Sequence, residues 1–349
     1  MPKRIDPVLD ARITIAEPSA EISTSDAGSF SMIRQGTATN DLVKTVSTSR
    51  NTTIDKVTGT ATIRRGSLTI AIPNYAALAG LKTSTAQLFD ALMIKLTESG
   101  AKTPTVEIPL SEYMERRGLK DRKEAKAQAR ADMEMLRPMS ISWEEKRGGK
   151  LERYGFINLA DSGEIRRNGD IVFTFGTSFY NTAKGYPVMP YPDQLQRLNG
   201  KRNPHSYPFL RKISEHKSMN AGKDNEDIIS VQTLLKAAET LPTFEEVKRT
   251  DRAFSRRIIE PFERDMDALA DTLTWEYCHS KGVPLTDTEL QALDYQTFGG
   301  LLIHILWNEY PDQTARLERK AARIEAAKQK SGGNGQQKRT SKKQKSPEK

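Results

Sequence analysis

Apolar residues recur at helical spacing in the first half of the chain, and glycine and proline mark where the predicted elements end. Leu88, Leu92 and Leu96 are four residues apart, which places their side chains on one face of a helix that Gly100 ends. The pattern after this helix predicts, in order, a strand and a helix over 106–119, a helix over 121–138, two strands around Gly148–Gly149 and a strand over 170–176. Ser111 and Asp121 are expected to cap the second and third helices.

The second half of the chain repeats this order of elements. Helices are predicted over 206–220, 229–239 and 250–272, followed by a strand over 273–278 and its partner within 295–311. The third of these helices carries an apolar stripe at spacings of 4, 4, 4 and 3, made of Phe254, Ile258, Phe262, Met266 and Leu269. Pro261 interrupts this helix, which costs about 3 kcal/mol in an ordinary helix interior, but the stripe continues in register beyond it.

A helix, a strand, two helices and a β-hairpin form the order of a winged-helix domain, whose third helix enters the major groove of DNA. We therefore predict an α+β, mainly helical fold with two tandem winged-helix domains and small β-wings, at residues 66–185 and 206–311. The proline-rich segment 186–205 is predicted to be a linker between them. Residues 1–65 are rich in Ser, Thr and Asp, which predicts a flexible, disordered N-terminal arm.

The positive charge of the chain is concentrated at its C-terminal end. From Arg316 to Lys349 there are 12 Lys and Arg against 3 Asp and Glu, which accounts for the whole formal excess of +9. The preceding residues carry equal numbers of acidic and basic side chains, so net charge is no argument that the folded part binds DNA. We interpret residues 312–349 as a basic, low-complexity tail that binds phosphates without sequence preference or improves solubility.

Membrane insertion and secretion find little support in the sequence. No apolar run approaches the roughly 18 to 20 residues of a membrane-spanning helix, and the first residues lack the apolar centre of a signal peptide. The one cysteine, Cys278, has no partner for an internal disulfide. We therefore expect a cytoplasmic protein with no membrane partner.

Signals of catalysis are weak. The chain has no glycine-rich phosphate-binding loop of the GxxxxGK[ST] type, and its four histidines lack the spacing of a metal-ligand pair. A DNA-nicking initiator uses a tyrosine nucleophile, for which the candidates are Tyr180, Tyr186 and Tyr191. Such enzymes also need a metal-binding histidine pair, which this sequence lacks. We expect no enzyme activity, no catalytic residue, no metal and no cofactor.

Basic side chains cluster on the third helix of the first predicted domain. Four of them share one face of the helix: Arg122, Lys123, Lys126 and Arg130. The alternative is a solvated helix in which these cations pair with Glu124, Asp132 and Glu134. The predicted wing adds candidates for the DNA backbone or minor groove, namely Lys146, Arg147, Lys150 and Arg153.

Four arginines surround the N-terminal half of the third helix in the second predicted domain: Arg249, Arg252, Arg256 and Arg257. Arginine favours bidentate contacts to guanine or phosphate, so this cluster is the stronger candidate for DNA contact. Surface ion pairing with Asp251 and Glu260 is the alternative.

The segment FSRRIIEPFERDMDAL at 254–269, followed by the strand LTWEYC, resembles the third helix and adjoining strand of the second winged-helix domain in plasmid replication initiators. In that family an Arg-Arg pair leads into an apolar-Glu-Pro turn, and Arg256, Arg257, Glu260 and Pro261 stand in those places. The segment RKEAKAQARADMEMLRPMSISW is similar to the corresponding part of the family's first domain. The resemblance covers roughly residues 65–311 and implies binding to repeated origin sequences, recruitment of host replication proteins and a switch between monomer and dimer.

We hypothesise that the chain is a plasmid or mobile-element replication initiator that binds double-stranded origin DNA through both third helices. The partners this implies are origin repeats, host replication proteins and a second copy in a homodimer. A winged-helix transcriptional regulator is the alternative, because initiators often repress their own promoters. A nicking or priming enzyme would need a divalent-metal site, and a structural protein would tolerate Arg256→Ala and Arg257→Ala with no effect on nucleic acids.

Overall fold

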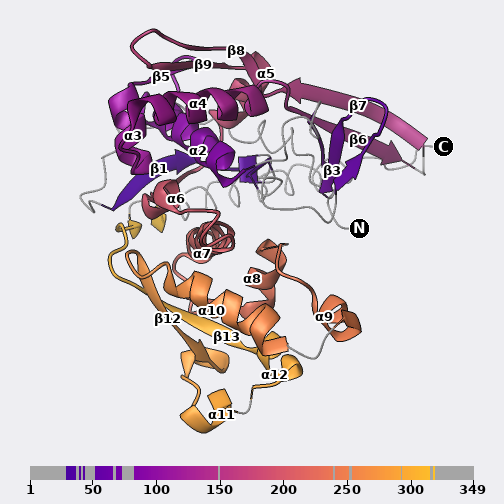
Figure 1. The fold of residues 1–349 in the computed structure, drawn as a ribbon, viewed down its shortest axis with the longest axis vertical. Helices are drawn as coiled ribbons and strands as arrows, with labels where there is room; N and C mark the ends of the chain where they lie inside the picture. The colour runs from indigo at the N-terminus through magenta and orange to yellow at the C-terminus, as the bar shows by residue number, and fades with distance from the viewer. Residues whose placement is uncertain are drawn as a thin grey trace, which may run out of the picture.

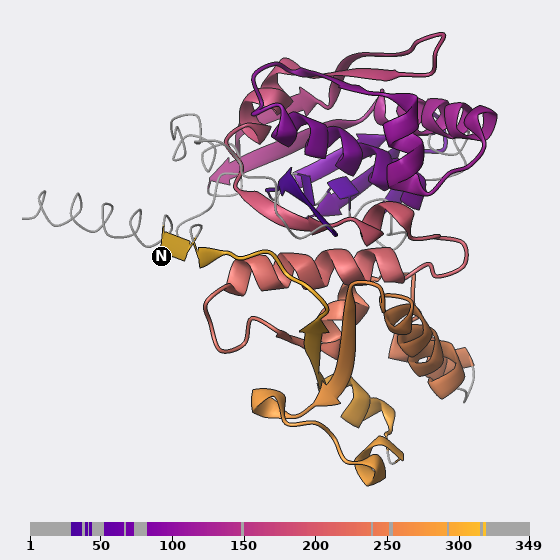
Figure 2. The same cartoon turned by 90° about the vertical axis from the view of Figure 1, so that its left-hand side faces the viewer.

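The computed structural model describes residues 29–36, 39–40, 42–43, 52–65, 68–72, 82–147, 150–238, 240–250, 254–291, 293–314 and 317–318. Over these residues helices combine with antiparallel sheets, as the predicted α+β class requires. Figure 1 shows an upper body built from the first half of the chain and a lower body built from the second. Helix α7 (Ser206–Asn220) runs between the two bodies, which Figure 2 shows from the side.

The upper body contains the predicted helix–strand–helix–helix order. Its elements are α2 (Thr83–Glu98), β5 (Thr105–Ile108), α3 (Leu110–Arg117), α4 (Arg122–Leu136), β8 (Ala160–Ile165) and β9 (Ile171–Phe175). Strands β5, β9 and β8 form an antiparallel sheet in that order, and the leucine stripe of α2 is fully buried. The predicted end of α3 at Gly118 is confirmed at φ +63°, and Asp121 caps α4 by accepting the amide of Glu124. Pro109, rather than Ser111, is the N-cap residue of α3.

The hairpin predicted as the first wing belongs to a different sheet. β6 (Ser140–Arg147) and β7 (Lys150–Asn158) do pair with each other, but they extend a five-stranded sheet in the order β2-β3-β4-β6-β7. The hairpin that completes the sheet of β5 is β8–β9 instead. Strand β8, with the sequence ADSGEI, escapes prediction because its residues are mostly exposed and so show no apolar alternation.

The prediction of a disordered arm over residues 1–65 is wrong for the part that the structure describes. β1 (Phe30–Arg34) pairs with β10 (Val188–Pro192), while β2 (Thr52–Ile54) and β3 (Ala61–Arg65) join β4 (Leu68–Ile72) in the five-stranded sheet. The buried apolar residues here include Ile33, Leu42, Val43 and Ile63. Each short strand holds few apolar residues, and their burial depends on segments far along the chain, because β1 pairs with β10 and β4 connects β2 and β3 to β6. Local composition therefore underestimates the burial of these strands. Residues 1–28 lie outside the described residues.

The segment predicted as a linker over 186–205 joins the two bodies but is itself packed. After α5 (Thr177–Ala183) it contains β10 and the short helix α6 (Gln194–Arg197). Tyr191 and Leu195 in these elements are buried. The connection is folded chain rather than a free tether.

The lower body follows the order of the upper one, apart from an additional helix before its third helix and the β6–β7 hairpin of the upper body. After α7 it contains β11 (Ile228–Ser230), α8 (Val231–Ala237), α9 (Phe244–Thr250), the π-helical turn η1 (Ser255–Ile259), α10 (Glu260–Asp267), β12 (Leu273–Cys278) and β13 (Leu302–Trp307). Its sheet order is β11-β13-β12, so in both bodies the last strand lies between the other two. An insertion between β12 and β13 holds η2 (Ser280–Gly282), α11 (Asp287–Gln291) and α12 (Tyr295–Gly300).

The third helix of the lower body is shorter than predicted. A π-helical turn just before Pro261 accommodates the proline in this helix. Helix α9, which was not predicted, precedes it, and residues 251–253 between them lie outside the described residues. The described part of the third helix begins at Phe254, and α10 ends at Asp267 rather than at residue 272. The amide of Glu260 donates to the carbonyl of Ser255, five residues back, so one extra residue precedes the proline, which has no amide to donate. The predicted stripe is confirmed by the burial of Ile258, Phe262, Met266 and Leu269.

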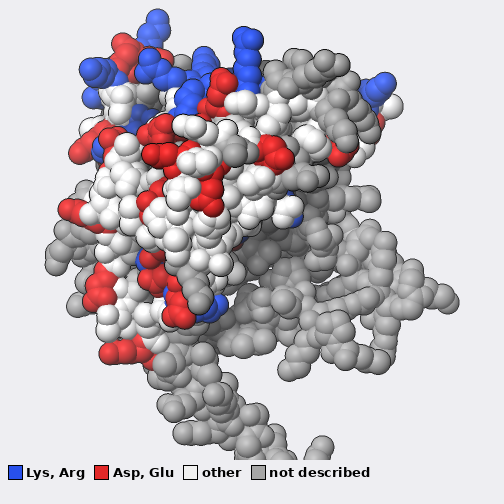
Figure 3. All heavy atoms as spheres, turned by 90° about the horizontal axis from the view of Figure 1, so that it is seen from below, with Lys and Arg blue, Asp and Glu red and all other residues white. Residues whose placement is uncertain are grey.

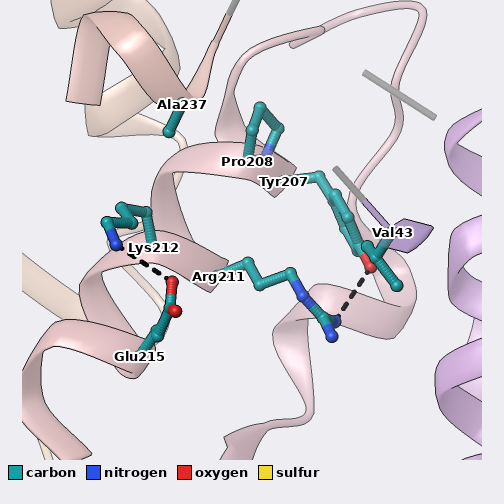
Figure 4. Close-up of a pocket in the computed structure, with 7 residues that line it drawn as sticks. All are labelled: Val43, Tyr207, Pro208, Arg211, Lys212, Glu215 and Ala237. Carbon is teal, nitrogen blue, oxygen red and sulfur yellow. Dashed lines mark hydrogen bonds and ion pairs between the residues drawn. The ribbon is translucent and has the colours of Figure 1, made fainter. Parts of the chain in front are cut away.

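A buried ion pair joins the two bodies. Arg211 of α7 and the fully buried Asp90 of α2 are 2.6 Å apart between Nη1 and Oδ2. The same carboxylate oxygen accepts hydrogen bonds from the hydroxyls of Tyr191 at 2.8 Å and Tyr207 at 2.5 Å. Burial opposes the charge of Arg211, but the Asp90 carboxylate outweighs burial and the pKa of the guanidinium is raised. Figure 4 shows Tyr207 and Arg211 reaching toward each other beside a hollow at the surface.

Two further buried aspartates tie each third helix to the helix beneath it. Asp132 of α4 accepts hydrogen bonds from the hydroxyls of Ser84 and Thr85 on α2, each at 2.8 Å. Asp265 of α10 accepts the backbone amide of His205, just before α7, at 2.8 Å. Helices α4, α2, α7 and α10 are thus linked in series by three buried carboxylates.

We expect Arg211→Ala to lower the free energy of unfolding by about 3–5 kcal/mol, because it leaves the Asp90 carboxylate buried without its cation. Denaturant unfolding followed by circular dichroism measures the change. Lys212→Ala is the matched control on the same helix, because its pair with Glu215 is partly solvated and worth about 0–1 kcal/mol. Equal losses in the two variants would contradict a special role for the buried pair.

Asp132 predicts a pH dependence of stability that Asp132→Asn removes. Burial raises the pKa of this carboxyl above 3.8, although hydrogen bonds from Ser84, Gln128 and Thr85 oppose the shift. The folded state therefore holds the proton more tightly than the unfolded state, and this residue's contribution to stability falls as pH rises from 3.8 through the raised value. The free energies of unfolding of the protein and of the Asp132→Asn variant, measured across this pH range, should converge at low pH. A difference between them that shrinks as pH rises would contradict the assignment.

Candidate nucleic-acid interface

The four basic residues predicted on the third helix of the first domain lie together on the outer side of α4. Arg122, Lys123 and Arg130 are exposed, and Lys126 is partly buried. The opposite side of α4 packs into the body through Ala125 and Ala129, whose small side chains are fully buried. One face of α4 therefore builds the core and the other presents cations to solvent.

Two of the three acidic residues expected to neutralise this cluster are engaged elsewhere, while Glu124 is exposed in the first turn of α4. Asp132 is buried against α2, and Glu134 pairs with Arg137 at 3.3 Å. Within the described ranges, Lys123 and Arg130 make no ion pair and no side-chain hydrogen bond. The alternative of a helix covered by ion pairs within its own surface does not describe the outer face of α4.

The β8–β9 turn is fixed against the beginning of α4 by hydrogen bonds. Lys126 Nζ donates to the carbonyl of Arg167 at 3.0 Å, and Arg122 Nη2 donates to the carbonyl of Asn168 at 3.3 Å. Gly169 has a φ of +99°, and a Cβ at this position would come within 2.5 Å of side-chain atoms of Leu110 and Lys126. Only glycine allows the turn to approach α4 this closely.

Arg167 is a candidate contact residue that the sequence analysis missed. It is exposed in the β8–β9 turn, whereas the neighbouring Arg166 pairs with Glu107 at 2.7 Å and Glu164 at 3.1 Å. The sequence signal was the pair of arginines beside Asn-Gly, a dipeptide typical of hairpin turns. Because β8 was not predicted as a strand, this turn was not assigned to a hairpin.

The four arginines predicted around the third helix of the second domain are only partly brought together. Arg256 is exposed and Arg257 is partly buried on η1. Arg249 lies in the last turn of α9, a helix that was not predicted, and Arg252 lies outside the described residues. Lys150, predicted in the first wing, begins β7 and so belongs to the five-stranded sheet instead.

Both third helices face the same side of the molecule. In Figure 1, α4 and α10 are drawn in front of the sheets of their bodies, and in Figure 2 the same segments lie toward the right. Figure 3 shows Lys and Arg gathered along its upper edge, which is the front of Figure 1, while Asp and Glu spread over the face toward the viewer. Some Asp and Glu also lie among the Lys and Arg of this edge, so the two signs of charge are only partly separated in this view.

Neither a metal-binding cluster nor a membrane-spanning helix is found in the part of the chain that the structure describes. Among the described residues, no group of three or more His, Cys, Asp or Glu side chains is arranged to hold a metal ion. Across the same ranges, no helix combines the length and apolar character that crossing a bilayer requires.

Comparison with known proteins yields structural neighbours only. No family model and no curated protein sequence matches the chain. The crystal structure of selenomethionine derivatives of domains 2 and 3 of RctB aligns at 11% identity with a TM-score of 0.43, covering 88% of this chain and all of that one. A second crystal structure of RctB domains 2–3 aligns at 10% identity with a TM-score of 0.37, covering 76% of this chain and 96% of that one. Both TM-scores are below 0.5, so any assignment of function rests on the residues of this chain.

Proposed function

We propose that the two bodies are winged-helix units and that the chain binds double-stranded DNA sequence-specifically through α4 and through the helix of η1 and α10. The repetition of one architecture supports this most directly. The two bodies share an order of elements, apart from β6–β7 in the upper body and α9 in the lower one, and each three-stranded sheet has its last strand between the other two. In winged-helix domains the third helix enters the major groove. The second unit is assigned to 206–311, and the first reaches back from 185 to include β2–β4, while β1 pairs with β10 in the connecting segment.

On α4, Lys123 and Arg130 supply contacts that are not committed within the protein. An arginine on this face can read guanine through two parallel hydrogen bonds, and a lysine can contact either a base edge or a phosphate. Arg122 and Lys126 contribute charge while they hold the β8–β9 turn in place. The turn then brings Arg167 to the DNA backbone or minor groove beside the helix.

In the lower unit, Arg256 and Arg257 occupy the first turn of the third helix. The π-helical turn that carries them is a local departure from α-helical geometry, and such turns occur frequently at functional sites. Arg249 adds positive charge from α9. We propose that these arginines contact a second part of the same DNA site.

We propose that this binding serves initiation of replication at an origin with repeated sites, and that the chain acts by binding rather than by catalysis. The resemblance to plasmid initiators supports this role, because its most specific segment coincides with η1 and α10. Host replication proteins and a second copy of the chain are the proposed partners. A transcriptional regulator would use the same contacts, so a test of replication must separate the two.

We expect Arg130→Ala and Arg256→Ala each to weaken binding to a specific duplex by about 1–3 kcal/mol if the arginine reads a base, or to lower the salt dependence by about one ion if it contacts phosphate. Fluorescence anisotropy with duplex fragments from the gene's own neighbourhood, at about 150–200 mM salt, measures both quantities while suppressing the tail. Arg137→Ala is the matched control, because this arginine lies past the end of α4 and pairs with Glu134. The DNA-binding surface would be wrong if all three variants bound equally well.

The initiator role predicts that the gene, supplied in trans, maintains a plasmid that carries only the candidate origin. Plasmid retention without selection is the measurement, and the Arg256→Ala, Arg257→Ala variant should lose it. Tight and specific duplex binding without maintenance would leave a regulator and exclude the initiator.

A further inference from the structure

The loop between α6 and α7 carries positive charge that the protein itself does not use. Arg197 ends α6, and Lys201 and Arg202 follow in the loop, all three exposed. Lys82, directly before α2, is exposed as well. Within the part of the chain that the structure describes, none of these four side chains makes an ion pair or a hydrogen bond. Asp193 lies within electrostatic reach of Arg197 and offsets part of its charge, which leaves Lys201 and Arg202 as the main cations of the loop.

Hydrogen bonds and close packing fix the backbone of this loop. Oδ1 of Asn199 accepts the backbone amides of Lys201 at 2.9 Å and of Arg202 at 3.3 Å. A Cβ at Gly200 would overlap the hydroxyl of Thr83, so glycine lets the loop pack directly on the beginning of α2. The two cations are therefore presented from an ordered turn.

The segment that carries the loop is tied to both bodies. On one side Gln87 of α2 donates to the carbonyl of Leu198 at 2.9 Å. On the other side Gln194 of α6 donates to the carbonyl of Ala268, which ends α10, at 3.0 Å. Figure 2 shows the loop reaching out to the right between the upper body and α7, toward the side on which α4 and α10 lie.

The loop and the β8–β9 turn lie on opposite flanks of the exposed face of α4. The β8–β9 turn is bonded to Lys126, whereas Gln128 donates to the hydroxyl of Ser84 in the first turn of α2, on which the loop packs. With 3.6 residues per turn, Lys126 and Gln128 are about 200° apart around the helix. The exposed Lys123 and Arg130 point between them.

We propose that Lys201 and Arg202, with Lys82 beside them, contact the DNA phosphates that border the major groove on the flank of α4 opposite the β8–β9 turn. A helix about 10–12 Å wide fills a major groove about 12 Å wide, so elements on its two flanks meet the two backbones that border the groove. Contacts to phosphates fix the register of a protein on the duplex without reading its sequence. Because the same segment is bonded to α10, these contacts lie between the parts of the site read by the two third helices. The inference rests on the proposed duplex binding and adds a backbone contact to it.

The salt dependence of duplex binding by the full chain tests this contact, with fluorescence anisotropy as the measurement. The Lys201→Ala, Arg202→Ala double variant should bind more weakly, and the slope of log Kd against log salt should fall by about 1.8, since each lost phosphate contact removes about 0.9. The ratio between the Kd values for the specific duplex and for random duplex should stay unchanged, because a phosphate contact weakens binding to all sequences alike.

The matched control is the Lys102→Ala, Lys184→Ala double variant, which removes the same charge. Both lysines are exposed beyond the C-terminal end of α2, about 24 Å from the end on which the loop packs. Tyr180 connects the two positions, because Lys184 Nζ lies 5.3 Å from its ring centroid and its hydroxyl donates to the carbonyl of Ala101. The control should keep the slope of the unmodified protein. An equal fall in both double variants would overturn the proposal, because net charge rather than position would then explain it.

Phosphate ethylation interference locates the contacts on the DNA. Ethylated phosphates beside the segment read by α4 should block the unmodified protein, and the Lys201→Ala, Arg202→Ala variant should lose this sensitivity on one border of the groove only. An identical interference pattern in the folded variant overturns the proposal. If Arg130→Ala loses its preference for the specific duplex while the loop variant keeps the original slope, this inference alone fails. If the unmodified protein prefers no duplex over random DNA, the proposed function fails and the inference fails with it.

Discussion

The ion pair between Asp90 and Arg211 fixes the orientation of the two bodies relative to each other, because it joins α2 of the upper body to α7, which lies between the bodies. Any function that uses both bodies at once depends on this orientation. Removing two charges from water costs several kcal/mol per ion, and their attraction offsets that cost only when other hydrogen bonds satisfy the pair. Here the hydroxyls of Tyr191 and Tyr207 both donate to the Asp90 carboxylate. An apolar contact would tolerate small rotations, whereas the three directional contacts to Asp90 Oδ2 hold in one arrangement, although Asp90 Oδ1 and Arg211 Nε have no hydrogen-bond partner. We infer that the pair fixes relative orientation more than it adds stability.

The same constraint extends to both third helices through Asp132 and Asp265. Moving α4 away from α2, or α10 away from α7, would leave a buried carboxylate without the donors that satisfy it. These helices are therefore held at a fixed separation by polar contacts in series. On the proposed function, such a molecule would favour DNA sites whose two parts have one spacing, since neither helix can move independently to reach a shifted half-site.

Sequence patterns predicted the elements that are stabilised by their own neighbours. The apolar stripe of the lower third helix, the cap at Asp121 and the glycine that ends α3 are local signals, and each has its expected place. Strands without a clear local pattern were missed. β8 is a polar edge strand, β1 pairs with the distant β10, and β2 and β3 join the body through β4 and its distant partner β6. Asp90 and Arg211 are 121 residues apart, and no local pattern pairs them. Arg167 was missed for the same reason as β8.

The balanced charge of the chain before Arg316 illustrates why composition is a poor guide to this surface. Charges in solution are screened beyond about 8–10 Å, so a DNA phosphate senses the side chains near it rather than the total. Acids on another face of the molecule, as in Figure 3, therefore subtract little from the field in front of α4. What matters locally is that Asp132 and Glu134 are committed to other contacts, which leaves Lys123 and Arg130 uncompensated. Packing, not composition, makes this face of a neutral body positive.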